Sequence, residues 1–398
     1  MAGGVTRRRT LLLVLLVPLL ALAVAPLWLP GVVERTYNPV HPPAAPVAVS
    51  DADRALHARL LVADLHADSL LWDRDLLARG TRGHADLPRL LEGNVALQVF
   101  SAVTQAPAGG DSGRGQEDLD RVTPLIVAEL WPARTWGSRL QRAMYQAFLL
   151  QQVEARSEGA FVVIHSAAGL QHYLERRAAG GAVAPRLAGV LALEGAQALE
   201  GSLTNLELLH AAGYRVLGLA HLTDNEVAGS VHGRTQGGLT PFGRLVVARA
   251  EELGMLIDVA HSSPATIDDV LALARGPVIA SHTGVRGTAD NPRNLSDAQL
   301  DGIAKSGGLV GIGFWEVAVG GEDPRDIVRA IRYAADRIGT AHVALGSDFD
   351  GSVATPFDAS GLVQLTALLR ADRFTDDDIA AIMGGNVLSL LAATLPPR

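Results

Sequence analysis

The sequence contains no cysteine, and this absence excludes several classes of protein. Disulfide frameworks, thiolate metal sites, thiol catalysis and a lipidated-cysteine anchor all need a residue that the 398-residue chain lacks. A metal ion could therefore be held only by His, Asp and Glu side chains. Basic residues are also in the minority, 34 against 42 acidic ones, and form no basic stripe, so we expect no nucleic-acid partner.

A long run without charge occurs at the amino terminus. Arg7-Arg8-Arg9 precede an apolar run from Leu11 to Leu29, which is close to the ~20 residues that a membrane-spanning helix needs. Because arginines stay on the cytoplasmic side, the remainder of the chain should be exported. We favour an uncleaved membrane anchor from the length of the run. The small residues at Ala21–Ala25 leave a cleaved signal peptide as the alternative, and the protein would then be secreted.

The chain accordingly divides into three parts. Residues 1–30 are the predicted signal anchor or signal peptide, and residues 31–50 form a proline-rich spacer. Residues 51–398 are expected to fold as one domain on the periplasmic or cell-surface side of the membrane.

Short apolar runs alternate with longer helical patterns throughout residues 51–398. Runs without polar alternation are typical of parallel strands that are buried on both faces. Eight such runs are Leu60–Leu65, Val95–Val103, Ala188–Leu193, Arg215–Ala220, Met255–Ala260, Val278–Ala280, Leu309–Phe314 and Val343–Gly346. Helical patterns include Asn205–Ala212, Pro241–Leu253, Pro264–Ala274, Asp297–Lys305 and Pro324–Ile338. The alternation predicts an α/β protein with a (β/α)8 TIM barrel, and we place a ninth run, Phe161–Ile164, outside it.

Polar residues close six of these eight runs. In a (β/α)8 barrel the carboxyl ends of the strands converge on one mouth, where active sites lie. The residues concerned are His66, Asp68, Glu194, His221, His261, His282 and Asp348. His66 and Asp68 are two apart, so they point to the same side of an extended strand. Packing these groups together would require heavy desolvation, which divalent cations offset.

The set contains more ligands than one tetrahedral zinc ion uses. Two ions that share a bridging carboxylate lie ~3.5–4 Å apart and hold a nucleophilic hydroxide between them. Since only nitrogen and oxygen ligands are present, zinc is the first expectation, with manganese or cobalt as alternatives.

The motifs at these positions resemble those of the membrane (renal-type) dipeptidases of the amidohydrolase superfamily. The resemblance runs from about Leu60 to Asn386, in the family's order. It rests on Asp64-x-His66-x-Asp68, Glu194-Gly195, His221 with Asn225, Asp258-x-x-His261-Ser262, Ser281-His282, Arg293-Asn294 and Gly346-Ser347-Asp348-Phe349-Asp350-Gly351.

This resemblance implies a metal-dependent hydrolase barrel with two Zn²⁺ ions. His66 and Asp68 would bind the first ion, His261 and His282 the second, and Glu194 would bridge them. The family cleaves dipeptides, often with a D-residue at the carboxyl side, and its members are commonly homodimers.

The resemblance also implies catalytic and substrate-binding roles. His221 would contact the substrate and stabilise the oxyanion, and Arg293 would hold the terminal carboxylate, which suits its two-pronged guanidinium. Asp348 would take a proton from the bridging water and pass it to the leaving amine. Trp315 stands where animal relatives have a substrate-contacting Tyr, so it is expected to bind substrate with a different preference.

Two alternatives stay open at this point. The same barrel and metals could serve another amide hydrolase, a deacylase or a lactonase of the superfamily. A catalytically inactive binding protein would be expected to lack a ligand, and none of the expected ligands is missing.

Overall fold

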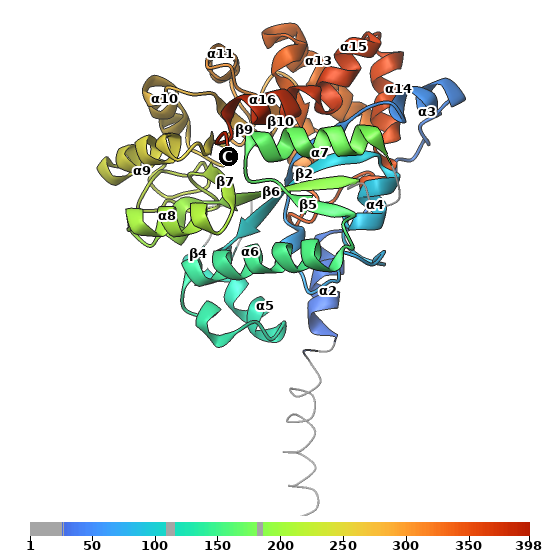
Figure 1. The fold of residues 1–398 in the computed structure, drawn as a ribbon. Helices are drawn as coiled ribbons and strands as arrows, with labels where there is room; N and C mark the ends of the chain where they lie inside the picture. Colours follow the sequence, from blue (N-terminus) through green and yellow to red (C-terminus); the bar gives the residue numbers. More distant parts are fainter. Residues whose placement is uncertain (1–25, 27, 109–115, 181–185) are drawn as a thin grey trace, which may run out of the picture.

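The protein folds as a closed barrel of parallel strands wrapped by helices. The computed structural model describes residues 26, 28–108, 116–180 and 186–398 (Figure 1). Eight strands close the ring, because β2 pairs both with β1 and with β6. In order around the ring they are β1 (Val62–Ala67), β2 (Val95–Val103), β6 (Leu187–Glu194), β7 (Tyr214–Gly218), β8 (Leu256–Asp258), β9 (Val278–Thr283), β10 (Val310–Ile312) and β11 (Val343–Leu345). The predicted (β/α)8 fold is confirmed.

The ninth apolar run forms a strand of the same sheet. β5 (Phe161–Val163) pairs in parallel with Leu187–Gly189 at the start of β6, while β7 pairs with Leu191–Leu193 further along. The closed ring of eight excludes β5, as predicted, but the strand still adds to the sheet. A separate two-stranded ribbon joins β3 (Pro107–Ala108) and β4 (Gln116–Asp120).

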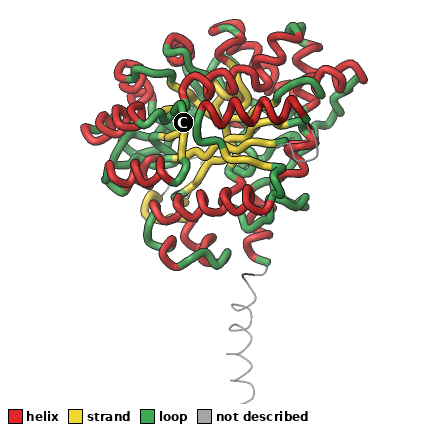
Figure 2. Tube along the Cα trace, viewed as in Figure 1, coloured by secondary structure: helices red, strands yellow, loops and turns green. Residues whose placement is uncertain are grey.

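Helices surround the barrel on its outer face (Figure 2). Several begin where a Ser or Thr side chain caps the first backbone N–H groups, often with proline in the first turn; Thr240 and Ser263 are examples. The helices are α2 (Leu29–Tyr37), α3 (Asp51–His57), α4 (Leu87–Glu92), α5 (Val122–Ala128), α6 (Arg139–Arg156), α7 (Ala167–Ala179), α8 (Leu203–Ala211), α9 (Pro241–Glu252), α10 (Pro264–Leu273), α11 (Asp297–Lys305), α12 (Glu316–Val319), α13 (Pro324–Ile338), α14 (Val363–Ala371), α15 (Asp376–Ala380) and α16 (Asn386–Thr394).

Two glycines allow three neighbouring strands to approach closely. A Cβ atom on Gly311 of β10, or on Gly346 just after β11, would lie 2.0 Å from the carbonyl oxygen of Ser281 in β9. Only glycine fits such a contact without moving backbone. The close approach brings the ends of β9 and β11, with the polar residues that follow, to the same part of the barrel mouth.

Helix α2 begins at Leu29, at the end of the predicted anchor, and continues to Tyr37 in the stretch predicted as a spacer. Its Glu34 side chain is buried, forms an ion pair of 2.6 Å with Arg74 Nε and accepts a hydrogen bond from Arg82. This buried ion-pair network packs the helix against the domain. The expected apolar segment from Leu11 lies outside the described residues except at its end, and among the helices that are described, none is both long and apolar enough to span a bilayer.

Candidate metal centre

The seven polar residues predicted from the strand ends lie together at the barrel mouth. Glu194, at the end of β6, is central: its Oε1 lies 3.2 Å from His261 Nε2 and 3.5 Å from the Nε2 atoms of both His66 and His282. Its other oxygen, Oε2, lies 3.6 Å from His221 Nε2. One carboxylate therefore faces four imidazole nitrogens that come from four other strands or strand ends.

A second group lies on one side of Glu194. His66 Nε2 is 3.4 Å from Asp68 Oδ1 and 3.9 Å from Asp348 Oδ1. Within each of three sets, the possible ligand atoms are no more than 4.8 Å apart: His66 with Glu194 and His282, Glu194 with His221 and His261, and His66 with Asp68 and Asp348. We call these seven residues the metal centre.

Unusual backbone conformations place two of these side chains. His261 and Asp348 both have positive φ, 61° and 60°, which non-glycine residues seldom adopt and which tends to occur at functional sites. Gly351 makes room for Asp348, since a Cβ atom there would lie 1.8 Å from Asp348 Oδ1. The turn after β11 is thus shaped around this carboxylate.

Polar partners on the outer ring nitrogen orient two of the imidazoles. His221 Nδ1 donates to the carbonyl oxygen of Gln105 at 3.2 Å, and His282 Nδ1 lies 2.9 Å from Ser281 Oγ. Both contacts leave Nε2 facing Glu194, as is usual for metal-binding histidines. Sequence reasoning missed both partners. The adjacency of Ser281 to His282 was a weak signal for one, while a backbone carbonyl gives no signal in the sequence.

Two aspartates fix the ends of the strands that deliver the ligands. The Asp64 carboxylate accepts hydrogen bonds from Ser347 N at 2.8 Å, Ser347 Oγ at 2.6 Å and Gln98 Nε2 at 2.9 Å, and so links β1, β2 and the residue before Asp348. Asp258 accepts a hydrogen bond of 2.9 Å from Ser281 N, which joins the end of β8 to β9.

The residues present fit a divalent metal. His66 Nε2, Asp68 Oδ1 and Glu194 Oε2 are buried and have no hydrogen-bond partner among the described residues. Leaving polar atoms in this state is costly. Divalent cations held by this cluster would give such atoms a partner, and imidazole nitrogen with carboxylate oxygen is the donor set that zinc and similar ions use.

The electrostatics of the centre also favour a cation. Burial raises the pKa of the Glu194 carboxyl well above its usual value, and the nearby Asp68 adds to the effect. For His66, burial lowers the pKa but the carboxylates of Asp68 and Glu194 outweigh it and raise the pKa to about 10. Burial, with neighbouring positive charge, keeps the pKa of His261 and of His282 well below the usual value, so both rings stay neutral, the form that binds metals.

Comparison with known proteins agrees with this geometry. The sequence profile of the membrane dipeptidases, peptidase family M19, matches residues 50–394. The chain belongs to the membrane dipeptidase family. The match covers every strand of the barrel and all seven residues of the metal centre.

Individual relatives support the same membership in this dipeptidase family. A Klebsiella pneumoniae protein, described as uncharacterized and encoded in the pqqA 5' region, is 32% identical over 64% of this chain and 97% of its own length. The dipeptidase verJ of Clonostachys rogersoniana is 33% identical over 52% of this chain, and the match spans about half, 55%, of that protein. A crystal structure of a Rhodobacter sphaeroides metallo peptidase, liganded with a phosphinate mimic of the dipeptide L-Ala-D-Ala, superposes with a TM-score of 0.67 at 27% identity and covers 84% of this chain and 99% of that one.

A buried ion pair behind the metal centre stabilises the loop after β11. Asp350 accepts hydrogen bonds of 2.5 Å from Ser69 Oγ and from His84 N, and it pairs with the Arg74 guanidinium. His84 is fully buried, and its Nε2 donates to the Pro39 carbonyl oxygen, so it does not reach the barrel mouth.

Replacing Asp350 by Asn should destabilise the fold. Burial alone would raise the pKa of Asp350, but Arg74 and the other donors hold it below the usual value. A lowered folded-state pKa contributes stability above the unfolded value of ~3.9, and this is lost as pH falls through the folded value. Because Arg74 would lose this partner, we expect Asp350→Asn to lower the free energy of unfolding by about 3–5 kcal/mol at pH 7. The free energy of unfolding of the variant should also fall less than that of wild type when the pH is lowered.

Urea denaturation at neutral and acidic pH measures both effects. Asp336→Asn is the matched control, since the Asp336 side chain is exposed and its ion pair with Arg332 is long, at 3.4 Å; we expect a change within about 1 kcal/mol. Equal stability of Asp350→Asn and the control at pH 7 would contradict this account of Asp350.

Proposed function

We propose that the chain is a dinuclear metal-dependent dipeptidase, with zinc as the preferred ion, that hydrolyses the peptide bond of short dipeptides. The main support is the position of Glu194, whose carboxylate oxygens lie 3.2–3.6 Å from the Nε2 atoms of four histidines and which belongs to two of the three groups of possible ligands. Membership in the membrane dipeptidase family agrees with it. The phosphinate mimic bound by the R. sphaeroides relative suggests that a D-residue is accepted at the carboxyl side here too.

The ions would supply one part of the chemistry. Two divalent cations held in this way lower the pKa of water and polarise the scissile carbonyl. Glu194 would contact both ions. His66 and Asp68 would also hold the first ion, and His261 and His282 the second.

Asp348 would move the proton. Its carboxylate lies beside His66 at the mouth, 8% exposed, and the positive-φ turn with Gly351 restricts its position. It would accept a proton from the attacking water and return it to the leaving amine.

His221 would stabilise the oxyanion only when protonated at both ring nitrogens. Its Nδ1 proton is committed to the Gln105 carbonyl, and burial together with the nearby His232 lowers its pKa to about 3. Negative charge developing on the substrate counteracts the lowering of this pKa by burial and His232, and so favours a proton on Nε2. His221 is then a donor in the transition state rather than in the ground state.

Arg293 would bind the carboxylate of the substrate. The residue is buried, its Nε has no hydrogen-bond partner among the described residues, and one Nη donates to the His282 carbonyl oxygen at 3.0 Å. Its guanidinium lies 5.5 Å from the centre of the Trp315 ring, which forms part of the wall of the cavity at the metal centre. A planar guanidinium beside the metal ligands suits a terminal carboxylate.

The proposed role of Arg293 allows a test of the proposed function. We expect Arg293→Ala to lower kcat/KM for Gly-Ala by roughly 100-fold, because charge-assisted hydrogen bonds are lost, and to have little effect on Gly-Ala amide, which lacks the carboxylate. Steady-state hydrolysis of both compounds by metal-loaded wild type and variant gives the comparison, with Arg325→Ala, an exposed arginine, as control. Failure of the wild type to cleave any dipeptide would contradict the function, and an equal loss for the amide would favour another amide hydrolase.

The proposal also includes the setting of the enzyme. The apolar segment behind Arg7-Arg8-Arg9 supports anchorage by residues 1–30, with the catalytic domain on the extracytoplasmic side, or secretion if the segment is cleaved. Homodimer formation, implied by the resemblance, is part of the same proposal.

A further inference from the structure

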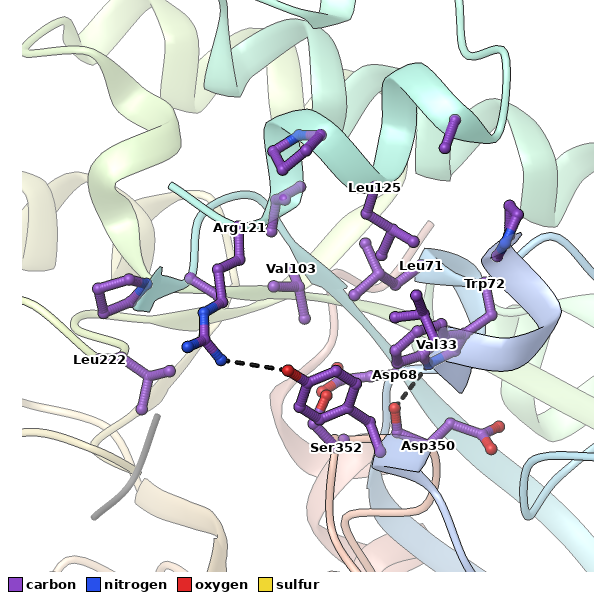
Figure 3. Close-up of a pocket in the computed structure, with 18 of the residues that line it drawn as sticks. Val33, Asp68, Leu71, Trp72, Val103, Arg121, Leu125, Leu222, Asp350 and Ser352 are labelled. Atoms are coloured by element: carbon purple, nitrogen blue, oxygen red, sulfur yellow. Dashed lines mark hydrogen bonds between the residues drawn. The ribbon is translucent and has the colours of Figure 1, made fainter. Parts of the chain in front are cut away.

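An apolar cavity of about 360 Å³ adjoins the metal centre. Its walls come from α2, the segment after β1, the end of β2 and α5; they include Val33, Leu71, Trp72, Val103, Leu125 and Ala128. Figure 3 shows the side chains of Val33, Leu71, Val103 and Leu125 grouped around the same space. We call it the apolar cavity. Its volume falls within the range of pockets that bind small molecules, ~300–1,000 Å³.

The apolar cavity meets the cavity at the metal centre. The latter, about 300 Å³, is lined by Glu194, His261, Trp315 and Asp348 among others. Both cavities are lined by Asp68 and His221. A substrate whose scissile bond lies at the metal centre could therefore extend directly into the apolar cavity.

The orientation of the substrate decides which of its two residues extends into the apolar cavity. Arg293 lies against His282 and Trp315, and neither it nor these two residues lines the apolar cavity. If Arg293 binds the carboxylate, the amino-side residue lies across the scissile bond from Arg293, and we take it to point toward Asp68 and His221, which line both cavities. This step rests on the proposed function.

The charges around the apolar cavity leave little to bind an ammonium group deep inside it. Among its described lining residues, Asp68 belongs to the metal centre and Asp350 is already paired with Arg74 and two further donors. The remaining charged side chain is Arg121, which donates to the Tyr37 hydroxyl at 3.2 Å (Figure 3). An apolar group is the occupant that needs no new polar partner.

One wall of the apolar cavity comes from residues before the range that the family profile matches. Leu29, Pro30, Val33 and Tyr37 belong to α2, whereas the family profile begins at residue 50. Helix α2 is fixed in place by the buried ion pairs of Glu34. This wall of the cavity is therefore formed by residues that precede the part of the chain matched by the family profile.

We propose that the apolar cavity binds the side chain of the substrate's amino-side residue and gives the enzyme a preference for large apolar side chains there. Burying an aromatic or branched side chain in such a cavity increases kcat/KM by about 10- to 100-fold over glycine. The substrate class is dipeptides with Leu, Phe or Trp at the amino side.

The test is a series of dipeptides, Gly-Ala, Leu-Ala, Phe-Ala and Trp-Ala, with metal-loaded protein. We expect wild type to favour Phe-Ala over Gly-Ala in kcat/KM by 10-fold or more. Ala128→Trp, which would fill the apolar cavity from α5, should reduce this ratio to about one. Val127→Trp is the matched control, because the adjacent Val127 is exposed and does not line the cavity, and it should keep the wild-type ratio.

A second variant changes the cavity in the opposite direction. Leu125→Ala enlarges the cavity and should raise the ratio of kcat/KM for Trp-Ala to that for Leu-Ala. This variant tests the inference if Ala128→Trp does not fold. A wild-type ratio of Phe-Ala to Gly-Ala near one, or variants that leave the ratios unchanged, would overturn the inference while dipeptide hydrolysis itself persists. Absence of hydrolysis of every dipeptide by the wild type would instead overturn the proposed function, and the inference with it.

Discussion

Replacing Glu194 by glutamine is expected to abolish both dipeptide hydrolysis and the binding of two divalent ions. Glu194 faces all four imidazoles of the metal centre, so it is the one residue that both ions would share. Glutamine keeps the shape but removes the negative charge that a bridging ligand supplies. Loss of kcat/KM should exceed about 10³-fold, more than the loss of a single transition-state hydrogen bond.

Thermal unfolding separates this effect from misfolding. Ions that bind only the folded state stabilise wild type by about 4 kcal/mol at 1,000 times the Kd, and Glu194→Gln should lose most of this increase. Without metal the variant should be at least as stable as wild type, because a carboxyl that burial makes costly to ionise is replaced by a neutral amide. Glu252→Gln, on the exposed end of α9, should behave as wild type. A metal-dependent rise in Tm that survives in Glu194→Gln would contradict the bridging role.

Replacing Asp348 by asparagine should lower kcat by about 10²- to 10⁴-fold, the usual contribution of a general acid–base group. Asparagine fits the same turn, tolerates positive φ and can still donate or accept hydrogen bonds, but it cannot take a proton from water. KM should change little because binding of the carboxylate by Arg293 is untouched. The dependence of kcat on pH should also change in shape, because Asp348 no longer titrates in the variant.

Metal analysis and kinetics on the same sample test the Asp348 prediction. The purified variant should retain metal, since Asp348 is not one of the proposed metal ligands, and Asp336→Asn serves again as the exposed control. A variant that retains both metal and more than half of the wild-type kcat would show that another group moves the proton.

The elements that sequence patterns located best are those whose signals are local. Helices α11 and α13 have the predicted bounds, because a Ser or Asp cap and an early proline or capping box mark where each begins. The strands were recognisable since each is buried on both sides and lacks polar alternation. Their ends were less well defined: β1 and β9 continue to Ala67 and Thr283, so His66 and His282 lie within strands.

The features that sequence reasoning missed depend on partners far away in the chain. Helix α2 lies in a proline-rich stretch, and it is held by the ion pairs of Glu34 with Arg74 and Arg82, which lie forty or more residues later. The hydrogen bond from His221 to the carbonyl of Gln105 spans an even longer separation and involves an atom that every residue has. Convergence of the ligands was predictable from the barrel rule, whereas the apolar cavity beside them depended on where α2 and α5 pack.

The central claim is that one carboxylate, Glu194, joins two metal ions at the barrel mouth. A crystal structure of metal-loaded protein, with anomalous scattering recorded on both sides of the zinc absorption edge, tests it most directly. The account predicts two anomalous peaks, each about 2.0–2.2 Å from a Glu194 oxygen, one near His66 with Asp68 and the other near His261 with His282. A single peak, or peaks that Glu194 does not touch, would contradict it.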